Sequence, residues 1–270
     1  MVVQHNMAAS NANRQLGIST NTLSKSTEKL SSGYRINRAA DDAAGLSISE
    51  KMRSQIRGLN KASSNAQDGI SAIQTAEGAL NEAHSILQRM NELATQSAND
   101  TNTTADRKAV QSEVNALTNE LSRIASTSQF NTQNLLDGTF TGKNLQVGAL
   151  ENQKITISIG TMNAKALGVD SLDVKSFTKA GAAMTLIQKA ISKVSGQRSD
   201  LGALQNRLEH TVNNLDNISE NTQTAESRIR DTDMASEMVQ YSATSIIQQA
   251  GQSMLAQANS QTQGVLSLIQ

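Results

Sequence analysis

Apolar residues recur every three or four positions along most of the chain, which is the spacing that places them on one face of an α-helix. The longest such ladder begins after Gly45 and continues without interruption to Ala94. At about 1.5 Å of rise per residue, a helix of this length is about 75 Å long and needs a partner along its whole apolar face. Its members are Ile48, Met52, Ile56, Leu59, Ala62, Ala66, Ile70, Ile73, Ala76, Leu80, Ala83, Leu87, Met90 and Ala94.

Two further ladders predict a return helix and a second long helix. The first follows a polar turn at residues 99–104, where Asn, Asp and Thr side chains favour chain reversal and helix capping; it comprises Val110, Val114, Leu117, Leu121 and Ile124. The second follows heptads, which are typical of a coiled-coil seam. It comprises Met184, Ile187, Ile191 and Val194, and then, at strict a and d positions, Leu201, Leu204, Leu208, Thr211, Leu215, Ile218, Thr222, Ala225 and Ile229.

The middle of the chain has a different pattern. Residues 143–149 and 153–160 alternate polar and apolar side chains, and Ile155, Ile157 and Ile159 fall on one face of a strand. We expect one β-hairpin with irregular flanks there.

Both ends of the chain carry further amphipathic helix. Leu16, Leu23 and Leu30 are seven residues apart, and Ile246, Ala250, Met254 and Ala258 form a stripe near the other end. The sequence therefore predicts a mainly α fold: a long antiparallel helical coiled-coil rod with one small β-hairpin region and with the termini paired at one end. The expected segments are an end helix and link (1–44), a long helix, return helix and hairpin (45–177), a long coiled-coil helix (178–230) and a second end helix (231–270).

Composition supports helices and excludes several classes of partner. Proline, tryptophan and cysteine are absent, so the commonest helix breaker is missing and no disulfide or thiolate metal site can form. Lys plus Arg equals Asp plus Glu at 24 each, which gives no electrostatic case for binding nucleic acid. We find no apolar run long enough to span a bilayer, and we do not expect a cleaved secretory signal. A neutral chain also does not resist self-association.

The candidate reactive residues have simpler structural interpretations. His5, His84 and His210 are far apart and lack the spacing of metal ligands. Asp41 and Asp42 are adjacent, but with basic residues nearby they are more simply explained as caps of a turn than as an acid/base pair. Most methionines fall on apolar ladders, where they are expected to fill the core. We therefore predict no catalytic residue, no metal, no cofactor and no enzymatic activity.

Both ends of the chain closely resemble the terminal regions of bacterial flagellins. The resemblance covers several long motifs that stand in the family's order. These are EKLSSGYRINRAADDAAGLSISEKMRSQIRGL (28–59), NAQDGISAIQTAEGALNEAHSILQRMNELATQSAND (65–100), RSDLGALQNRLEH (198–210) and QQAGQSMLAQANSQTQGVLSLI (248–269).

The resemblance implies a structural subunit that assembles with copies of itself into the flagellar filament for motility. The end helices would form the inner coiled coil and the long helices with the hairpin the outer shell, and the large outer domains of many flagellins are missing here. It also implies export in the unfolded state by the flagellar type III apparatus and a secreted, extracellular location. Further implied partners are an export chaperone at residues 233–270, the filament cap and the hook-filament junction proteins.

Assembly is expected to depend on the apolar residues of the two end helices, because neither helix can bury its stripe alone. We expect these segments to become ordered as copies pack together. The candidate assembly residues are Leu16, Leu23, Leu30, Ile246, Ile247, Met254, Leu255, Val265, Leu266 and Leu268.

Residues 88–107 also resemble the flagellin surface that the vertebrate host Toll-like receptor 5 recognises. By position, the resemblance implies main contacts at Arg89, Leu93 and Glu113, with Gln88 and Gln96 beside them. The alternative is that these residues stabilise packing between filament subunits, and both interpretations stay open at this point.

Two other functions fit parts of the sequence. A hook-filament junction protein shares such end helices but caps a junction instead of propagating. A soluble coiled-coil adaptor would stay oligomeric at a fixed size inside the cell. Self-polymerisation separates both alternatives from a filament subunit.

Overall fold

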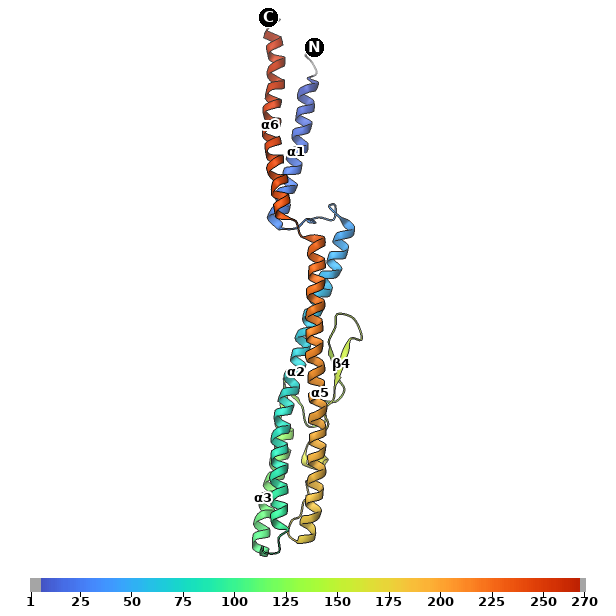
Figure 1. Ribbon diagram of the computed structural model, residues 1–270, viewed down its shortest axis with the longest axis vertical. Coiled ribbons are helices and arrows are strands. Elements are labelled where there is room, and N and C mark those ends of the chain that lie inside the picture. Colours follow the sequence, from blue (N-terminus) through green and yellow to red (C-terminus); the bar gives the residue numbers. More distant parts are fainter. Residues whose placement is uncertain (1–5, 268–270) are drawn as a thin grey trace. The chain divides into compact units, whose positions relative to one another are not determined.

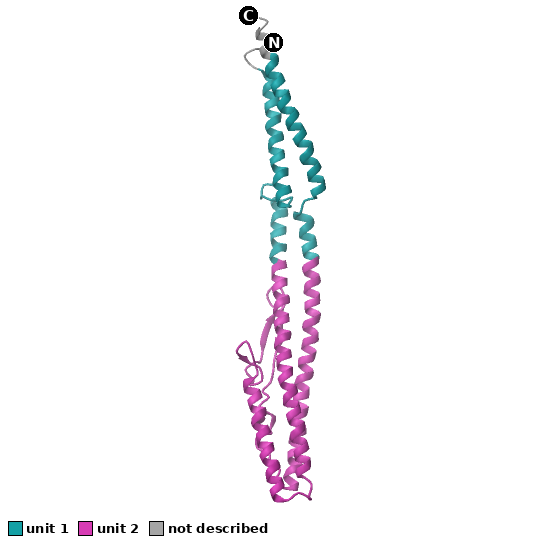
Figure 2. Cartoon of the chain, turned by 90° about the vertical axis from the view of Figure 1, so that its left-hand side faces the viewer, with its two compact units in different colours: residues 1–54, 221–270 teal, residues 55–220 magenta. Residues whose placement is uncertain are grey.

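The computed structural model describes residues 6–267, with side chains described as far as residue 261. The chain divides into two compact units (Figure 2): unit 1 comprises Met1–Ser54 and Asn221–Gln270, and unit 2 comprises Gln55–Glu220. The boundaries between the units fall inside the two longest helices and not at the links that separate the end helices.

The fold is mainly α, as predicted, and Figure 1 shows the order of its elements. Within the described residues the elements are α1 (Met7–Ser32), α2 (Ala43–Ser97), α3 (Thr104–Thr127), β1 (Gln129–Phe130), β2 (Gln133–Asn134), β3 (Lys143–Gln146), β4 (Lys154–Ile157), α4 (Ala164–Leu167), α5 (Phe177–Arg230) and α6 (Met234–Ser267). The expected long helices, return helix, end helices and links are therefore confirmed. The short pair of β1 with β2 and the single turn of α4 were not predicted.

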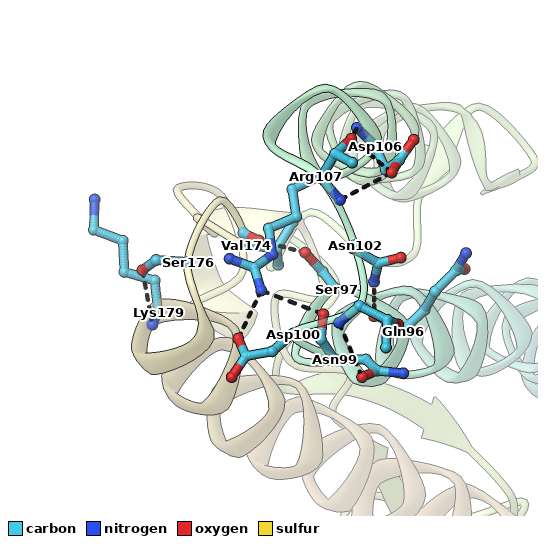
Figure 3. A network of polar contacts seen from close by, with 12 residues as sticks. Gln96, Ser97, Asn99, Asp100, Asn102, Asp106, Arg107, Val174, Ser176 and Lys179 are labelled. Atoms are coloured by element: carbon cyan, nitrogen blue, oxygen red, sulfur yellow. Dashed lines mark hydrogen bonds and ion pairs between the residues drawn. The ribbon is translucent and has the colours of Figure 1, made fainter.

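The reversal between α2 and α3 is held by a network of polar contacts in unit 2 (Figure 3). Thr103 caps α3 in a capping box with Asp106, in which each side chain hydrogen-bonds to the backbone N–H of the other residue. The Arg107 guanidinium donates to the carbonyl oxygen of Asn99 at 3.2 Å and to the Asp100 carboxylate at 3.0 Å. The polar residues that predicted the turn are thus the residues that fix it.

The hairpin of β3 and β4 confirms the predicted alternation. The strands pair antiparallel, with Lys143 opposite Ile157 and Gln146 opposite Lys154. Ile155, Ile157 and Ile159 are all buried, and they belong to the main core of unit 2 with apolar side chains of α2, α3 and α5.

Two glycines of α2 let the hairpin approach the helix closely. A Cβ added at Gly69 would lie 2.2 Å from Leu145 Cδ1, and one added at Gly58 would lie 2.9 Å from Ala149 Cβ. Glycine inside a helix costs about 1 kcal/mol relative to alanine. Close packing against β3 and the hairpin turn explains why that cost is tolerated at these two positions.

The heptad seam of α5 changes its spacing near one end of unit 2. Leu201, Leu208 and Leu215 are buried as predicted, but Ile218 is 41% exposed and Ser219 is buried instead. The prediction of Ile218 as a seam residue was therefore wrong. A straight helix has 3.6 residues per turn and drifts away from a strict seven-residue repeat, so a four-residue step restores contact. The buried Ser219 hydroxyl donates to Asn60 Oδ1 at 2.7 Å.

A buried glutamine on α3 fastens the segment that leads into α5. Gln111 donates to the carbonyl oxygen of Leu172 at 2.8 Å and accepts from the backbone N–H of Val174 at 2.8 Å. The hydroxyl of Ser97, which is also buried, donates to the carbonyl oxygen of Val174. These contacts satisfy backbone groups that would otherwise be buried without partners.

In unit 1, α1 and α6 lie side by side and antiparallel (Figure 1). Asn6 donates to the carbonyl oxygen of Ala258 at one end of the pair, and Lys29 forms an ion pair with Glu237 at the other. The expected pairing of the two terminal segments is therefore confirmed.

The links of unit 1 are also ordered. The N–H of Arg35 donates to the carbonyl oxygen of Arg230 at 2.7 Å, and the N–H of Thr232 donates to that of Gly33 at 3.0 Å. Two cations lie over the Tyr34 ring, with the guanidinium carbon of Arg230 4.7 Å and that of Arg53 5.9 Å from its centroid.

Asp41 and Asp42 cap turns, in agreement with the prediction. Asp41 accepts from the backbone N–H groups of Arg38 and Asn37, and the first of these bonds is the main reason that the pKa of its carboxyl is lowered. Asp42 accepts from the N–H of Gly45 at 2.8 Å, at the start of α2.

Candidate functional site

The face of α6 that packs against α1 is mostly polar or small. Gln248 donates to the Thr20 hydroxyl at 3.3 Å, and Gly251 lies against the side chain of Leu16. The side chains of this face, all buried or half-buried, are Glu237, Tyr241, Thr244, Ser245, Gln248, Gly251, Leu255 and Ala258. Only two of them, Leu255 and Ala258, are aliphatic, so the surface that α6 contributes to this interface is mostly polar or small.

The opposite face of α6 is more apolar than the packed face. A continuous stripe along it has the three- to four-residue spacing of one helical surface, and every member is exposed. We call it the α6 stripe; it comprises Ala235, Val239, Ala243, Ile246, Ile247, Ala250 and Met254. Val239 is 71% exposed, Ile246 66%, Ile247 58% and Met254 65%.

This distribution is the reverse of that found on a surface helix of a globular protein, whose apolar stripe faces the core. Glu237 is the one charged residue of α6, and it lies on the packed face. The α6 stripe therefore has no charged group to oppose burial. Contiguous exposed apolar surface of this kind is typical of sites where proteins associate.

The structure separates the predicted assembly residues into three groups. Leu16, Leu23, Leu30 and Leu255 are half-buried, whereas Ile246, Ile247 and Met254 belong to the α6 stripe. Val265 and Leu266 lie in α6, but their side chains are not among those described, and Leu268 lies outside the described residues.

Sequence reasoning missed Val239 and Ala243. The signal was present, because Val239 is seven residues before Ile246 and Ala243 is seven before Ala250.

The predicted receptor contacts lie in unit 2, on α2 and α3. Arg89 donates to Glu113 Oε1 through Nε at 3.1 Å and through Nη2 at 2.9 Å, which links the two helices. Hydrogen bonds to Glu113 and then to Glu92 raise the pKa of Arg89. Gln88, Arg89, Gln96 and Glu113 are exposed, but Leu93 is only 2% exposed and belongs to the core.

Side chains that could bind a metal ion are not grouped in the part of the chain that the structure describes. Among residues 6–267 no three acidic or histidine side chains are grouped so that they could hold a metal ion. His5 lies outside the described residues. No described helix has an apolar stretch of the length needed to cross a bilayer.

Known proteins share the helical end regions of this chain. The bacterial flagellin N-terminal helical region matches residues 3–141, and the bacterial flagellin C-terminal helical region matches residues 184–269. The flagellin of Halalkalibacterium halodurans is 55% identical, and that of Bacillus subtilis 48% identical; in each case the match covers all of both chains.

A filament protein of a spirochaete and one solved structure are also similar. The flagellar filament 33 kDa core protein of Treponema phagedenis is 51% identical over the whole of both chains. The crystal structure of Bacillus cereus flagellin is 32% identical with a TM-score of 0.50, and the match covers 56% of this chain and 88% of that one. With the helical end regions, the motif order and the full-length relatives in agreement, the chain belongs to the bacterial flagellin family.

Proposed function

We propose that this flagellin is the structural subunit of a flagellar filament outside the cell, and that its copies associate by burying the α6 stripe. The family is structural and not enzymatic. The observation that carries the proposal is that the outward face of α6 is more apolar than the face packed on α1.

Burial of the stripe between copies would favour polymerisation. Removing the remaining exposed surface of an aliphatic side chain from water contributes roughly 1 to 2 kcal/mol. Val239, Ile246, Ile247 and Met254 together offer several times that amount for each subunit. A contact of one surface with a different surface of the next copy propagates into a helical polymer when the rotation does not close.

In this arrangement residues 1–44 and 231–270 supply the inner core, and residues 45–177 and 178–230 supply the outer shell. Leu16, Leu23, Leu30 and Leu255 hold α1 against α6, and the α6 stripe receives the neighbouring copy. The sequence carries three further apolar assembly candidates toward its end, Val265, Leu266 and Leu268.

A matched pair of charge substitutions tests the proposal. Ile247→Asp introduces a carboxylate into the stripe, and Gln252→Asp introduces the same group at an exposed position of α6 outside it. After seeding, the natural chain and the Gln252→Asp variant are expected to form filaments that pellet and are visible by electron microscopy. The Ile247→Asp variant should stay in the supernatant, because burying an unpaired charge costs several kcal/mol. Normal filaments from Ile247→Asp, or equal loss in both variants, would reject the stripe as the assembly surface.

We also propose that the chain is exported unfolded by the flagellar type III apparatus. It contains no cysteine and hence no disulfide that would prevent threading. Before export, a chaperone covers residues 233–270, because the α6 stripe would otherwise expose its apolar side chains in the cytoplasm. The filament cap and the hook-filament junction proteins contact the end subunits, whose stripes have no neighbouring copy. Co-purification of the chaperone with the natural chain, and its loss with residues 233–270 removed, tests the chaperone contact.

Recognition by Toll-like receptor 5 is a separate proposal, supported by the exposed face of Gln88, Arg89, Gln96 and Glu113. Because Leu93 is buried, a receptor on this face touches the other four, and Leu93 holds the helix that presents them. Arg89→Ala is expected to weaken binding of the purified receptor ectodomain, with Arg123→Ala, an exposed arginine elsewhere on α3, as the control. Unchanged binding by a folded Arg89→Ala variant would favour the alternative role in subunit packing.

A further inference from the structure

The α6 stripe contains one side chain that mild oxidants attack. Of its seven residues six are Ala, Val or Ile, which are inert, and the seventh is Met254, whose thioether side chain is exposed. The expectation that methionines fill the core holds for Met90, which is buried, but it fails for Met254. Free subunits therefore present a reactive sulfur at one end of an otherwise unreactive apolar stripe.

We propose that Met254 is a reversible oxidation site that controls assembly, with hydrogen peroxide or another hydroperoxide as the oxidant. This inference rests on the proposed burial of the α6 stripe between copies. The sulfur lone pair of Met254 attacks a peroxide oxygen and the O–O bond breaks. The transferred oxygen stays on the sulfur and gives its proton to the displaced hydroxide, or to the displaced alkoxide of another hydroperoxide, so the products are methionine sulfoxide and water or an alcohol. The sulfur loses two electrons and the peroxide gains them.

Oxidation changes the surface where the next copy must pack. The sulfoxide is a polar group with a strong acceptor oxygen, and it replaces a flexible apolar group. Burying a polar group without a hydrogen-bond partner opposes association. The neighbours of Met254 along the stripe, Ala250 and Ile247, carry no side-chain donor that could satisfy the new oxygen. A subunit oxidised at this position is therefore a poor substrate for the growing filament.

Other exposed methionines of unit 1 lie away from the stripe. Met234 and Met238 directly precede the stripe residues Ala235 and Val239. Each methionine is therefore rotated by about 100° around the helix axis from the stripe residue that follows it. Met7 is exposed on α1. The same peroxide treatment oxidises these side chains, and they serve as internal controls for position.

The experiment compares three chains, namely the natural chain, Met254→Leu and Met238→Leu, before and after treatment with hydrogen peroxide. Peptide mass spectrometry measures sulfoxide at each methionine, and pelleting measures the critical concentration for polymerisation. We expect oxidation to raise the critical concentration of the natural chain and of Met238→Leu about tenfold or more, which corresponds to at least about 1.4 kcal/mol per subunit. Treated Met254→Leu should polymerise like the untreated protein, although Met7, Met234 and Met238 are oxidised.

Reversal provides a second readout. Reduction of the treated natural chain by methionine sulfoxide reductases for both sulfoxide epimers should restore its critical concentration. The proposal is overturned if the oxidised natural chain polymerises normally, or if treated Met254→Leu is impaired to the same extent. Failure of the proposed function is distinguishable, because in that case the untreated chain does not polymerise, or the Ile247→Asp variant polymerises as well as the natural chain.

Discussion

Gly58 and Gly78 lie in the same helix, α2, but only one of them faces another segment. A Cβ at Gly58 would meet Ala149 Cβ at 2.9 Å and its Cα at 3.3 Å, whereas a Cβ at Gly78 meets nothing within 4 Å. Substitution by alanine at either position gains about 1 kcal/mol of helix propensity. The difference in stability between the two variants therefore measures the clash of the added Cβ with the hairpin.

We expect Gly78→Ala to stabilise the protein by about 0.5 to 1 kcal/mol, and Gly58→Ala to be less stable than Gly78→Ala by about 1 to 3 kcal/mol because of overpacking. Denaturant unfolding followed by circular dichroism measures both values. Equal stabilisation by the two substitutions would show that the hairpin turn does not press on α2.

Substitution of Gln111 tests the polar contacts that hold the segment before α5. Gln111→Ala leaves the N–H of Val174 and the carbonyl of Leu172 without their partner, and both residues are buried. Each unsatisfied buried group costs about 1 to 3 kcal/mol, so we expect a loss of roughly 2 to 5 kcal/mol. The exposed neighbour Ser112→Ala is the control and should change the free energy of unfolding by less than about 0.5 kcal/mol. A small effect at Gln111 would mean that water replaces its amide.

Sequence patterns predicted some of these residues and not others. The turn caps at Asp41 and Asp42 follow from local chemistry, because a carboxylate near backbone N–H groups needs no tertiary information. The burial of Gln111 could not be predicted, because the backbone groups of Leu172 and Val174 that it binds are more than sixty residues away along the chain. The spacing placed Met254 on an apolar ladder and among the assembly candidates, but an apolar ladder indicates a helix face and not which molecule covers it.

At the scale of elements, periodicity predicted the helices and the hairpin well. The ladder from Ile48 to Ala94 became α2, and the alternation around Ile157 became β4. The exchange of Ile218 for Ser219 in the seam could not be predicted from heptads alone, because it depends on where α5 drifts out of phase with its partner.

The capping box of α3 makes the stability that this helix start contributes depend on pH. Hydrogen bonds from the Thr103 hydroxyl, and then from its backbone N–H, lower the pKa of Asp106. A carboxyl whose pKa is lower in the folded state contributes stability that is present above its unfolded value, about 3.9, and is lost as the pH falls through the folded value.

We therefore expect the melting temperature of the natural chain to decrease when the pH is lowered below about 4. Asp106→Asn removes the titrating group and should show a smaller fall over the same range. Because Asp137 and Asp173 also have lowered pKa values, part of the acid sensitivity should remain in the variant. An identical acid dependence of the two proteins would contradict a stabilising role for the Asp106 carboxylate.

At the scale of the whole molecule, the two units differ in how they bury apolar surface. Unit 2 has a continuous core in which Leu80, Leu87 and Ile187 are fully buried. Unit 1 pairs α1 with a mostly polar face of α6 and leaves the α6 stripe exposed. The first is the arrangement of a self-sufficient domain, and the second is that of a subunit completed by its neighbours.

Chemical access to the stripe tests this account most directly. Since the chain contains no cysteine, Ala250→Cys places a single thiol within the α6 stripe, and Gln252→Cys places one at an exposed position outside it. The rate of alkylation is measured for free subunits and for seeded filaments. We predict that filament formation slows alkylation of Ala250→Cys roughly hundredfold, because access then requires local opening, and slows Gln252→Cys much less. Filaments in which the Ala250→Cys thiol reacts as fast as in free subunits would contradict burial of the stripe between copies.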